Sequence, residues 1–225
     1  MTSVTRYGTR TKTSAAVVDH VLEEIFEGRL KAGDRVDLDQ VCVDLDVSRL
    51  PVREAVVILE RDGILSTRYH RGVFVEPFDE QSIIDDFEVV GLLSGLAVRR
   101  LAEKQDAATI DALQHLVREL QAVDAGDRNE MLRLVREILA LEHRVGGSRR
   151  LRAELRTFVG FFPWVFRISM DQGHRHAVTA HSRVVEAIAA GDGATAAMVR
   201  LEDFRTVGGN VVRELRQRGV LEPQD

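Results

Sequence analysis

The sequence predicts a mainly α-helical chain with a small N-terminal domain that carries one β-hairpin and a larger all-α bundle of about six helices. Apolar residues recur at helical spacing along most of the chain. The alternating stretch "ILSTRYHRGVFV", from Ile64 to Val75, predicts two short strands joined by a turn. After Pro77 the helical pattern is broken only by turn-forming residues, so we expect two domains and a short hinge over 77–81.

Composition narrows the class of protein. A chain of 225 residues with 44% hydrophobic composition is long and apolar enough to fold around a core. The single cysteine, Cys42, cannot form an internal disulfide, which favours a cytoplasmic location. Residues 1–12 lack the apolar core of a signal peptide, and no stretch predicts a membrane span, so we expect a soluble protein with no membrane partner. The net charge of -5 does not exclude a local basic surface.

The N-terminal domain is expected over residues 13–76, behind a flexible basic arm at 1–12. A first helix starts at Thr13 or Ser14 and ends at Gly28. One face of that helix is apolar, comprising Val17, Val18, Val21, Leu22, Ile25 and Phe26. A turn-rich connection then leads to a short helix.

The next helix is predicted by "VSRLPVREAVVILERDGIL", from Val47 to Leu65. Ser48 suits the N-cap, where its hydroxyl can satisfy free backbone amides, and Pro51 is tolerated in the first turn. The positive end of such a helix can bind phosphate. Arg49 and Arg53 lie four residues apart, and both can therefore reach a DNA duplex. The opposite face is apolar, with Val52, Val56 and Leu59.

The order helix, turn, helix and hairpin is that of a winged helix-turn-helix. The hairpin tip would form a polar wing that follows the DNA backbone or enters the minor groove. We therefore predict double-stranded DNA contacts from Ser48, Arg49, Arg53, His70, Arg71 and Gly72. The alternative is that the arginines belong to a solvated helix face and pair with Glu54 and Glu60.

The same stretch closely resembles the DNA-binding domain of the GntR family of bacterial transcriptional regulators, whose pattern "VSR-x-PVREAL-x-x-L-x-x-G-(L/I)" it follows. The resemblance covers about Ser14 to Val75, including the wing "RYHRGVFV". It implies phosphate and base contacts from the six residues named above. Many relatives carry an arginine where this chain has Asp39, which implies a different operator preference.

The helical domain, expected over residues 82–220, resembles the FadR-like branch of that family, with the best fit at "HSRVVEAIAAGD". Members are dimers controlled by a small molecule, often a carboxylate bound near a metal. The metal is held by an Asp, a His four residues later and two further His. Here those positions fall on Val135, Leu139, His181 and Asp203, so we predict no metal and no cofactor. The alternative is a metal-dependent sensor of small carboxylates. Three further histidines have no recognised ligand spacing and are expected at the surface, namely His143, His174 and His176.

An aromatic stretch, "FVGFFPWVF" from Phe158 to Phe166, suggests the effector. It either fills a core or dimer face or, kinked at Pro163, borders an apolar cavity. On the second interpretation, the effector is a fatty acyl or other lipid-derived molecule. The predicted effector-binding residues are His181, Asp203, Phe162, Trp164 and Phe166.

Taken together, these features predict a sequence-specific transcriptional repressor that reads a near-palindromic operator as a homodimer and responds to a small-molecule effector. A helical metalloenzyme is a further alternative. An enzyme is not predicted, however, because the sequence lacks the metal ligands that it would need and contains no nucleophile elbow, phosphate loop or convincing acid–base pair. A protein-interaction adaptor is a further alternative, which a steep salt dependence of DNA binding would exclude.

Overall fold

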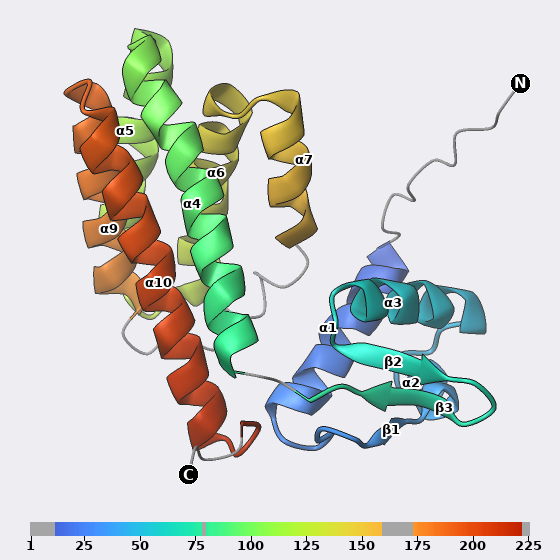
Figure 1. Ribbon diagram of the computed structural model, residues 1–225. Helices are drawn as coiled ribbons and strands as arrows, with labels where there is room; N and C mark the ends of the chain where they lie inside the picture. The colour runs from blue at the N-terminus through green and yellow to red at the C-terminus, as the bar shows by residue number, and fades with distance from the viewer. Residues whose placement is uncertain (1–11, 78–79, 159–172, 222–225) are drawn as a thin grey trace, which may run out of the picture. The chain divides into compact units, whose positions relative to one another are not determined.

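The computed structural model describes residues 12–77, 80–158 and 173–221 (Figure 1). The predicted basic arm and three of the predicted effector-binding residues, Phe162, Trp164 and Phe166, lie outside the described residues. The chain divides into two units, which are Met1–Asp79 with Leu215–Asp225, and Glu80–Glu214. Residues 215–220 therefore group with the first unit rather than with the predicted domain 82–220, because they pack with that unit.

The first unit begins with α1 (Lys12–Phe26), which starts within two residues of the predicted N-terminus. All six apolar residues predicted for its inner face are buried, and Gly28 follows with a φ of +74°. A left-handed φ is easily adopted by glycine, so Gly28 ends the helix as expected. Next come α2 (Leu38–Asp44) and α3 (Arg49–Arg61). The apolar face of α3 packs inward as predicted, with Val52, Val56 and Leu59 buried.

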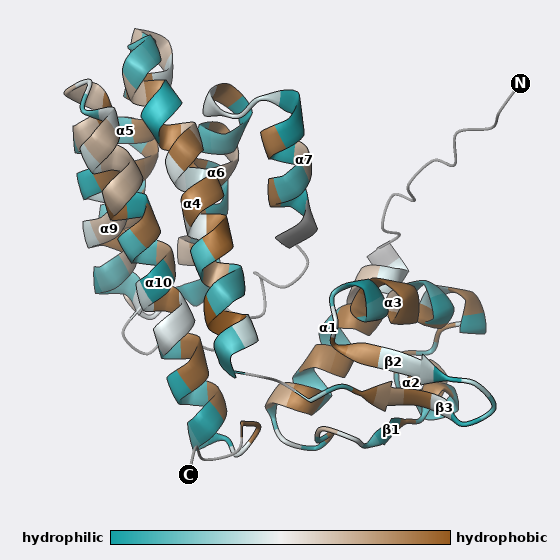
Figure 2. Cartoon of the chain, viewed as in Figure 1, coloured by the Kyte–Doolittle hydropathy of each residue, from teal (hydrophilic) through white to brown (hydrophobic). Residues whose placement is uncertain are grey.

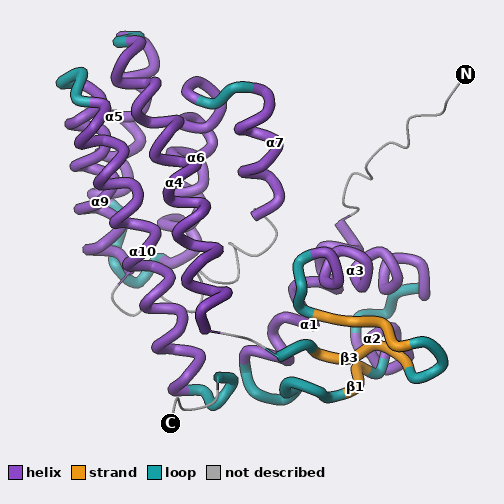
Figure 3. Tube along the Cα trace, viewed as in Figure 1, coloured by secondary structure: helices purple, strands orange, loops and turns teal. Residues whose placement is uncertain are grey.

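The sheet of this unit has three antiparallel strands in the order β1-β3-β2 (Figure 3). The predicted hairpin is confirmed as β2 (Leu65–Arg68) and β3 (Gly72–Val75), with Leu65 opposite Val75. The additional strand, β1 (Arg35–Val36), pairs with β3 inside the segment interpreted as a turn-rich connection. This third strand was not predicted, because a two-residue strand is too short to show an alternating pattern.

Within its described residues, the second unit is all-α, as predicted. Its helices are α4 (Glu80–Lys104), α5 (Ala107–Ala122), α6 (Arg128–Gly146), α7 (Arg149–Phe158), α9 (Gly173–Ala189) and α10 (Gly193–Gln217). Asp106 and Asp127 cap α5 and α6 by accepting hydrogen bonds from backbone amides. Gly146 lets α6 approach α4 closely, since a Cβ atom there would overlap the carbonyl oxygen of Ala97. None of the helices in the described ranges is long and apolar enough to cross a bilayer.

Candidate nucleic-acid interface and effector cavity

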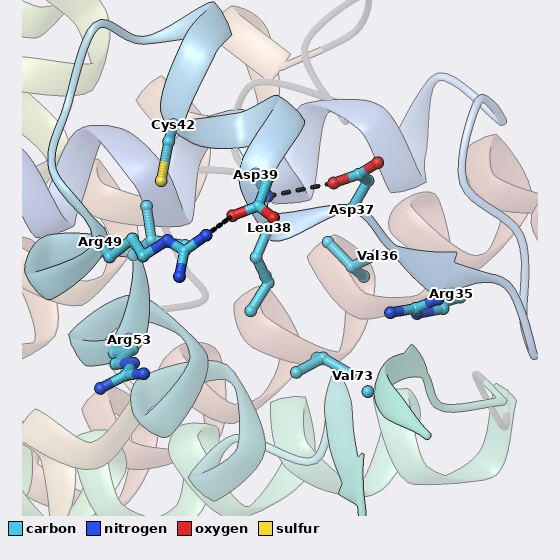
Figure 4. Close-up of a pocket in the computed structure, with 11 residues that line it drawn as sticks. Arg35, Val36, Asp37, Leu38, Asp39, Cys42, Arg49, Arg53 and Val73 are labelled. Carbon is cyan, nitrogen blue, oxygen red and sulfur yellow. Dashed lines mark hydrogen bonds and ion pairs between the residues drawn. The ribbon is translucent and has the colours of Figure 1, made fainter. Parts of the chain in front are cut away.

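A groove of about 510 Å³ opens in the first unit between α2, the start of α3 and strands β1 and β3 (Figure 4). Three arginines, Arg35, Arg49 and Arg53, line it, together with the acidic residues Asp37 and Asp39. Such a groove offers guanidinium groups beside a helix N-terminus. This combination attracts phosphate groups and the acceptor atoms on base edges. The remaining lining residues are Val36, Leu38, Cys42, Val52, Gly72 and Val73.

Ser48 occupies the N-cap position of α3 in extended backbone, with φ -73° and ψ 167°, but its hydroxyl makes no capping hydrogen bond. The predicted use of that hydroxyl was therefore wrong. An N-cap side chain accepts from the second or third helical amide, and the third helical residue is Pro51, which has no N–H. Ser48 is exposed, so its hydroxyl can face a ligand instead.

Arg49 and Arg53 are both exposed and line the groove. Their environments differ. Arg49 Nη2 lies 2.9 Å from Asp39 Oδ1, whereas Arg53 has no ion-pair partner among the described residues. The alternative interpretation of the two arginines, ordinary surface pairing with Glu54 and Glu60, therefore does not describe Arg49, whose partner comes from α2.

The wing tip connects β2 to β3 through Tyr69, His70 and Arg71. His70 has a φ of +56°, and the amide of Arg71 donates to the carbonyl of Arg68 at 2.9 Å. Residues 69–71 are all exposed, with Tyr69 at 87%. Of the predicted wing residues, Gly72 lines the groove, while His70 and Arg71 project at the tip beyond its lining.

Arg35 is a groove residue that the sequence did not single out. It lies directly beneath the wing, because a Cβ atom on Gly72 would come within 2.7 Å of Arg35 Nε. Gly72 also has a φ of +106°, so two separate features favour glycine there. The pairing of Arg35 with Phe74 across β1 and β3 fixes this arrangement, and no sequence signal marked that strand.

A second, small cavity of about 30 Å³ lies in the second unit. It brings together all four positions that the resemblance associates with a metal, Val135, Leu139, His181 and Asp203. The register assigned to these residues from sequence is thus consistent with the structure. The other lining residues are Met131, Gly173, His176, Ala177, Phe204, Val207 and Asn210.

Next to this cavity lies a buried network centred on Arg200, whose side chain has no exposed surface. Arg200 donates to Glu142 at 2.6 Å and to Asp203 at 2.7 Å, and it lies 3.2 Å from His181 Nδ1. His176 Nε2 lies 2.9 Å from Asp203 Oδ1. Arg200 and Glu142 were not predicted from the sequence. The available signal was the spacing of Arg200 and Asp203 by three residues in one helix.

The expectation that His143, His174 and His176 lie at the surface was wrong, because all three are partly buried and have polar partners. His143 Nε2 is 2.9 Å from Ser94 Oγ, and His174 Nε2 is 3.1 Å from the carbonyl oxygen of Leu120. The polar partner of each of these histidines lies on another helix. A single sequence does not reveal such contacts between helices.

Burial, hydrogen bonds and the charge of Arg200 together shift the pKa values of the groups around it. It lowers the pKa of His181 to about 3, and the charge of Arg200 acts in the same direction. The same two causes lower the pKa of His143 to about 4. Burial alone would raise the pKa of Asp203, but the hydrogen bond with His176 and the charge of Arg200 outweigh it and lower that pKa to about 2. The hydrogen bond with Asp203 raises the pKa of His176.

These residues do not fit a metal ion. Val135 and Leu139 have no donor atoms, and the carboxylate of Asp203 is already paired with Arg200 and His176. Within the described ranges, no group of three or more His, Cys, Asp or Glu side chains could hold a metal. The Arg200 guanidinium group places a positive charge next to the cavity, where it pairs with Glu142 and Asp203.

Together, the groove and the wing define a winged-helix DNA-binding protein with a separate helical unit. Residues 13–75 match the family "Bacterial regulatory proteins, gntR family", and residues 85–203 match the FCD domain. The chain is 31% identical over 220 residues to an HTH-type transcriptional regulator of Mycobacterium tuberculosis, covering 98% of this chain and 88% of that protein. The chain therefore belongs to the GntR family of transcriptional regulators and carries an FCD domain.

Two further similarities are more limited. A protein of Paenarthrobacter nicotinovorans named "Probable D-xylose utilization operon transcriptional repressor" is 29% identical over 120 residues, which is 53% of each chain. The solved structure of Escherichia coli McbR/YncC matches with a TM-score of 0.64 and 19% identity, covering 92% of this chain and 99% of that one. The second similarity shows the fold alone.

Proposed function

We propose that this transcriptional regulator reads its operator through the groove and the wing of the first unit. The single observation that carries this proposal is the convergence of Arg35, Arg49 and Arg53 on one groove at the N-terminus of α3. Arginine is the residue that most often reads guanine in the major groove, and it also pairs with phosphate. Ser48, His70, Arg71 and Gly72 would add contacts to the backbone on either side of the bases.

The second part of the proposal is a homodimer formed through one face of α4 and α10. Three exposed apolar residues lie on these helices, with Val89 43%, Leu92 55% and Met198 52% exposed. Gly91 and Gly95 bring α4 close to Leu201 and Ala197 of α10, so the two helices form one continuous surface. Figure 2 shows hydrophobic segments along the length of α4. A second copy of the chain is the partner expected, because a dimer presents two wings to a near-palindromic operator.

The third part concerns the effector. We propose that a small molecule enters the cavity lined by His181 and Asp203 and acts without a metal, since Val135 and Leu139 replace two ligands with apolar surface. A lipid-derived effector stays a prediction. Ligand cavities commonly measure about 300–1,000 Å³, so this one of about 30 Å³ would have to enlarge to admit an acyl chain. Effector binding would shift the population of dimers that fit the operator. The hinge that we propose ends before Glu80, because Glu80 and Gln81, which the predicted hinge over 77–81 included, belong to α4.

Repression is the mode we propose, and the only support from the comparisons is the printed name of the Paenarthrobacter nicotinovorans relative. A cytoplasmic location follows from the proposed role, because the operator lies there in a bacterium.

The proposal is tested by selecting bound duplexes from a random-sequence library with the full-length protein and titrating the selected duplex at several salt concentrations. We expect a near-palindromic motif, with an affinity that falls steeply as salt increases because phosphate contacts release counterions. Absence of a selected motif, or an affinity insensitive to salt, would overturn the DNA-reading role of the groove and favour a protein-interaction adaptor.

A further inference from the structure

Asp39 is an acidic side chain at a surface where DNA would bring many negative charges. It lines the same groove as the three arginines, and its side chain is 74% exposed. The other acidic residue of the groove, Asp37, has a structural role, because its carboxylate caps α2 by accepting from the amides of Asp39 and Gln40. The Asp39 carboxylate does not cap the helix and instead pairs with Arg49 (Figure 4).

The stability of the fold does not account for this ion pair. The Arg49 side chain is 73% exposed, and pairs between two such exposed groups contribute little to folding, because solvent screens them. In the DNA complex, an exposed carboxylate repels the phosphates of every sequence alike. Its position next to the first arginine of α3 is therefore expected to serve selectivity rather than affinity.

The geometry favours a role in orienting Arg49. One of its terminal nitrogens, Nη2, lies 2.9 Å from Asp39 Oδ1. A guanidinium group has five N–H donors in a fixed plane, so further donors stay available when one is engaged by a carboxylate. Guanine offers two acceptors, O6 and N7, to a pair of such donors. Bound DNA displaces water from the groove and reduces the screening of this pair, so Asp39 holds the guanidinium group more firmly in the complex than in the free protein.

We propose that Asp39 is a specificity-determining positioning residue that holds Arg49 for guanine and lowers affinity for DNA in general. This inference rests on the proposed reading of DNA through the groove. Arg35 and Arg53 have no carboxylate partner in the described part of the chain and are free to follow phosphates. Arg49 would thus read a base, and the other two arginines would mainly contribute affinity.

The experiment compares the wild-type protein with Asp39→Ala and Asp39→Asn, using full-length chains and duplexes selected from a random library. Each protein is titrated with the selected duplex, with a version changed at the guanine that Arg49→Ala no longer selects, and with a scrambled duplex. For both Asp39 variants we expect the discrimination at that base pair to fall by about tenfold, which is within the range for one bidentate contact. Affinity for the scrambled duplex should rise about two- to fivefold, because one negative charge is removed.

Glu60→Ala is the matched control, since Glu60 lies on α3 outside the groove lining and carries the same charge. It should leave the base preference unchanged. In an Arg49→Ala background, Asp39→Ala should have no further effect on discrimination, because its action requires the arginine. Asp39→Asn preserves the shape of the side chain, so a folding defect in Asp39→Ala would not decide the outcome.

Two outcomes would overturn the inference while leaving the proposed function intact. One is an equal gain in affinity for all three duplexes, which would make Asp39 a source of repulsion only. The other is a base preference in the Asp39 variants identical to that of the wild type. A wild-type protein that selects no motif would overturn the proposed function itself, and this inference with it.

Discussion

At the residue scale, the arginines of α3 carry the same charge but differ in whether they line the groove. Arg53 lines the groove, whereas Arg61, on the same helix, pairs with the neighbouring Asp62 at 2.9 Å and does not line it. Both side chains are exposed. A nonspecific attraction between a positive helix and DNA would depend on both arginines, but contact through the groove depends on Arg53.

The first prediction follows from this difference. Arg53→Ala should weaken binding to the selected duplex and to scrambled DNA by similar factors, and it should reduce the slope of log affinity against log salt by about 1, as loss of one phosphate contact does. Fluorescence anisotropy at several salt concentrations measures both quantities. Arg61→Ala is the control and should leave the slope unchanged; equal effects of the two substitutions would argue against the groove.

The lowered pKa values of His181 and His143 give a prediction about pH. The folded-state pKa values of His181 and His143 are about 3 and about 4, against 6.5 for an unperturbed histidine. Below pH 6.5 the unfolded chain therefore binds protons that the folded chain does not, and stability is lost as pH falls. The raised pKa of His176 acts only above that range, where stability is lost as pH rises.

We expect the free energy of unfolding to fall between pH 6 and pH 4.5 by up to about 1.4 kcal/mol per pH unit for each of the two histidines. Urea denaturation across this range measures the slope. His181→Gln should remove about half of it. If the free energy of unfolding does not change with pH over the same range, the folded-state pKa values of His181 and His143 are not lowered.

At the element scale, the helices with strong apolar periodicity could be predicted from sequence. The buried face of α1, the inward face of α3 and the interior positions Val135 and Leu139 all followed from spacing or resemblance. What could not be predicted depends on tertiary partners. Strand β1 exists because β3 is beside it, and Arg49 is held by a side chain from α2.

The Arg200 network belongs to the same class of feature. Its members come from three helices, since Glu142 lies on α6, His181 on α9 and Arg200 on α10. No local pattern indicates that such residues meet, and an arginine in an amphipathic helix is ordinarily exposed. Among the described residues, the buried atoms Glu142 Oε2 and Arg200 Nε have no hydrogen-bond partner, so the network is sensitive to any change in its members.

We predict that Arg200→Met destabilises the second unit by about 3–5 kcal/mol, because it leaves the carboxylates of Glu142 and Asp203 buried without their cation. Arg133→Met is the matched control. Arg133 also pairs with two carboxylates, those of Glu130 and Glu137, but on the exposed face of α6. It should cost less than about 1 kcal/mol. If urea denaturation gives similar losses of unfolding free energy for Arg200→Met and Arg133→Met, burial of the network does not determine the cost of removing its arginine.

At the scale of the whole molecule, the proposed reading of the operator requires two copies of the chain. A single winged unit has one groove and one wing, whereas a near-palindromic operator has two half-sites. The apolar face of α4 and α10 offers the surface that a second copy would cover. Dimerisation and operator affinity should therefore be lost together.

The double substitution Leu92→Glu with Met198→Glu should convert the dimer to a monomer, because it places charges at two exposed apolar positions of this face. Sedimentation velocity measures the change, and operator affinity should fall in parallel. The control is Ala112→Glu, which adds a charge at an exposed position of α5. A double variant that stays dimeric would place the dimer interface elsewhere.

The proposal that a dimer reads the operator through its groove arginines is tested most directly by the stoichiometry of the protein–DNA complex. Native mass spectrometry measures this stoichiometry on a duplex selected by the full-length protein. We expect two chains per near-palindromic duplex, and we expect the double variant Arg49→Ala with Arg53→Ala to form the free dimer but not the complex. One chain bound per duplex, or a complex that survives removal of both arginines, would contradict this proposal.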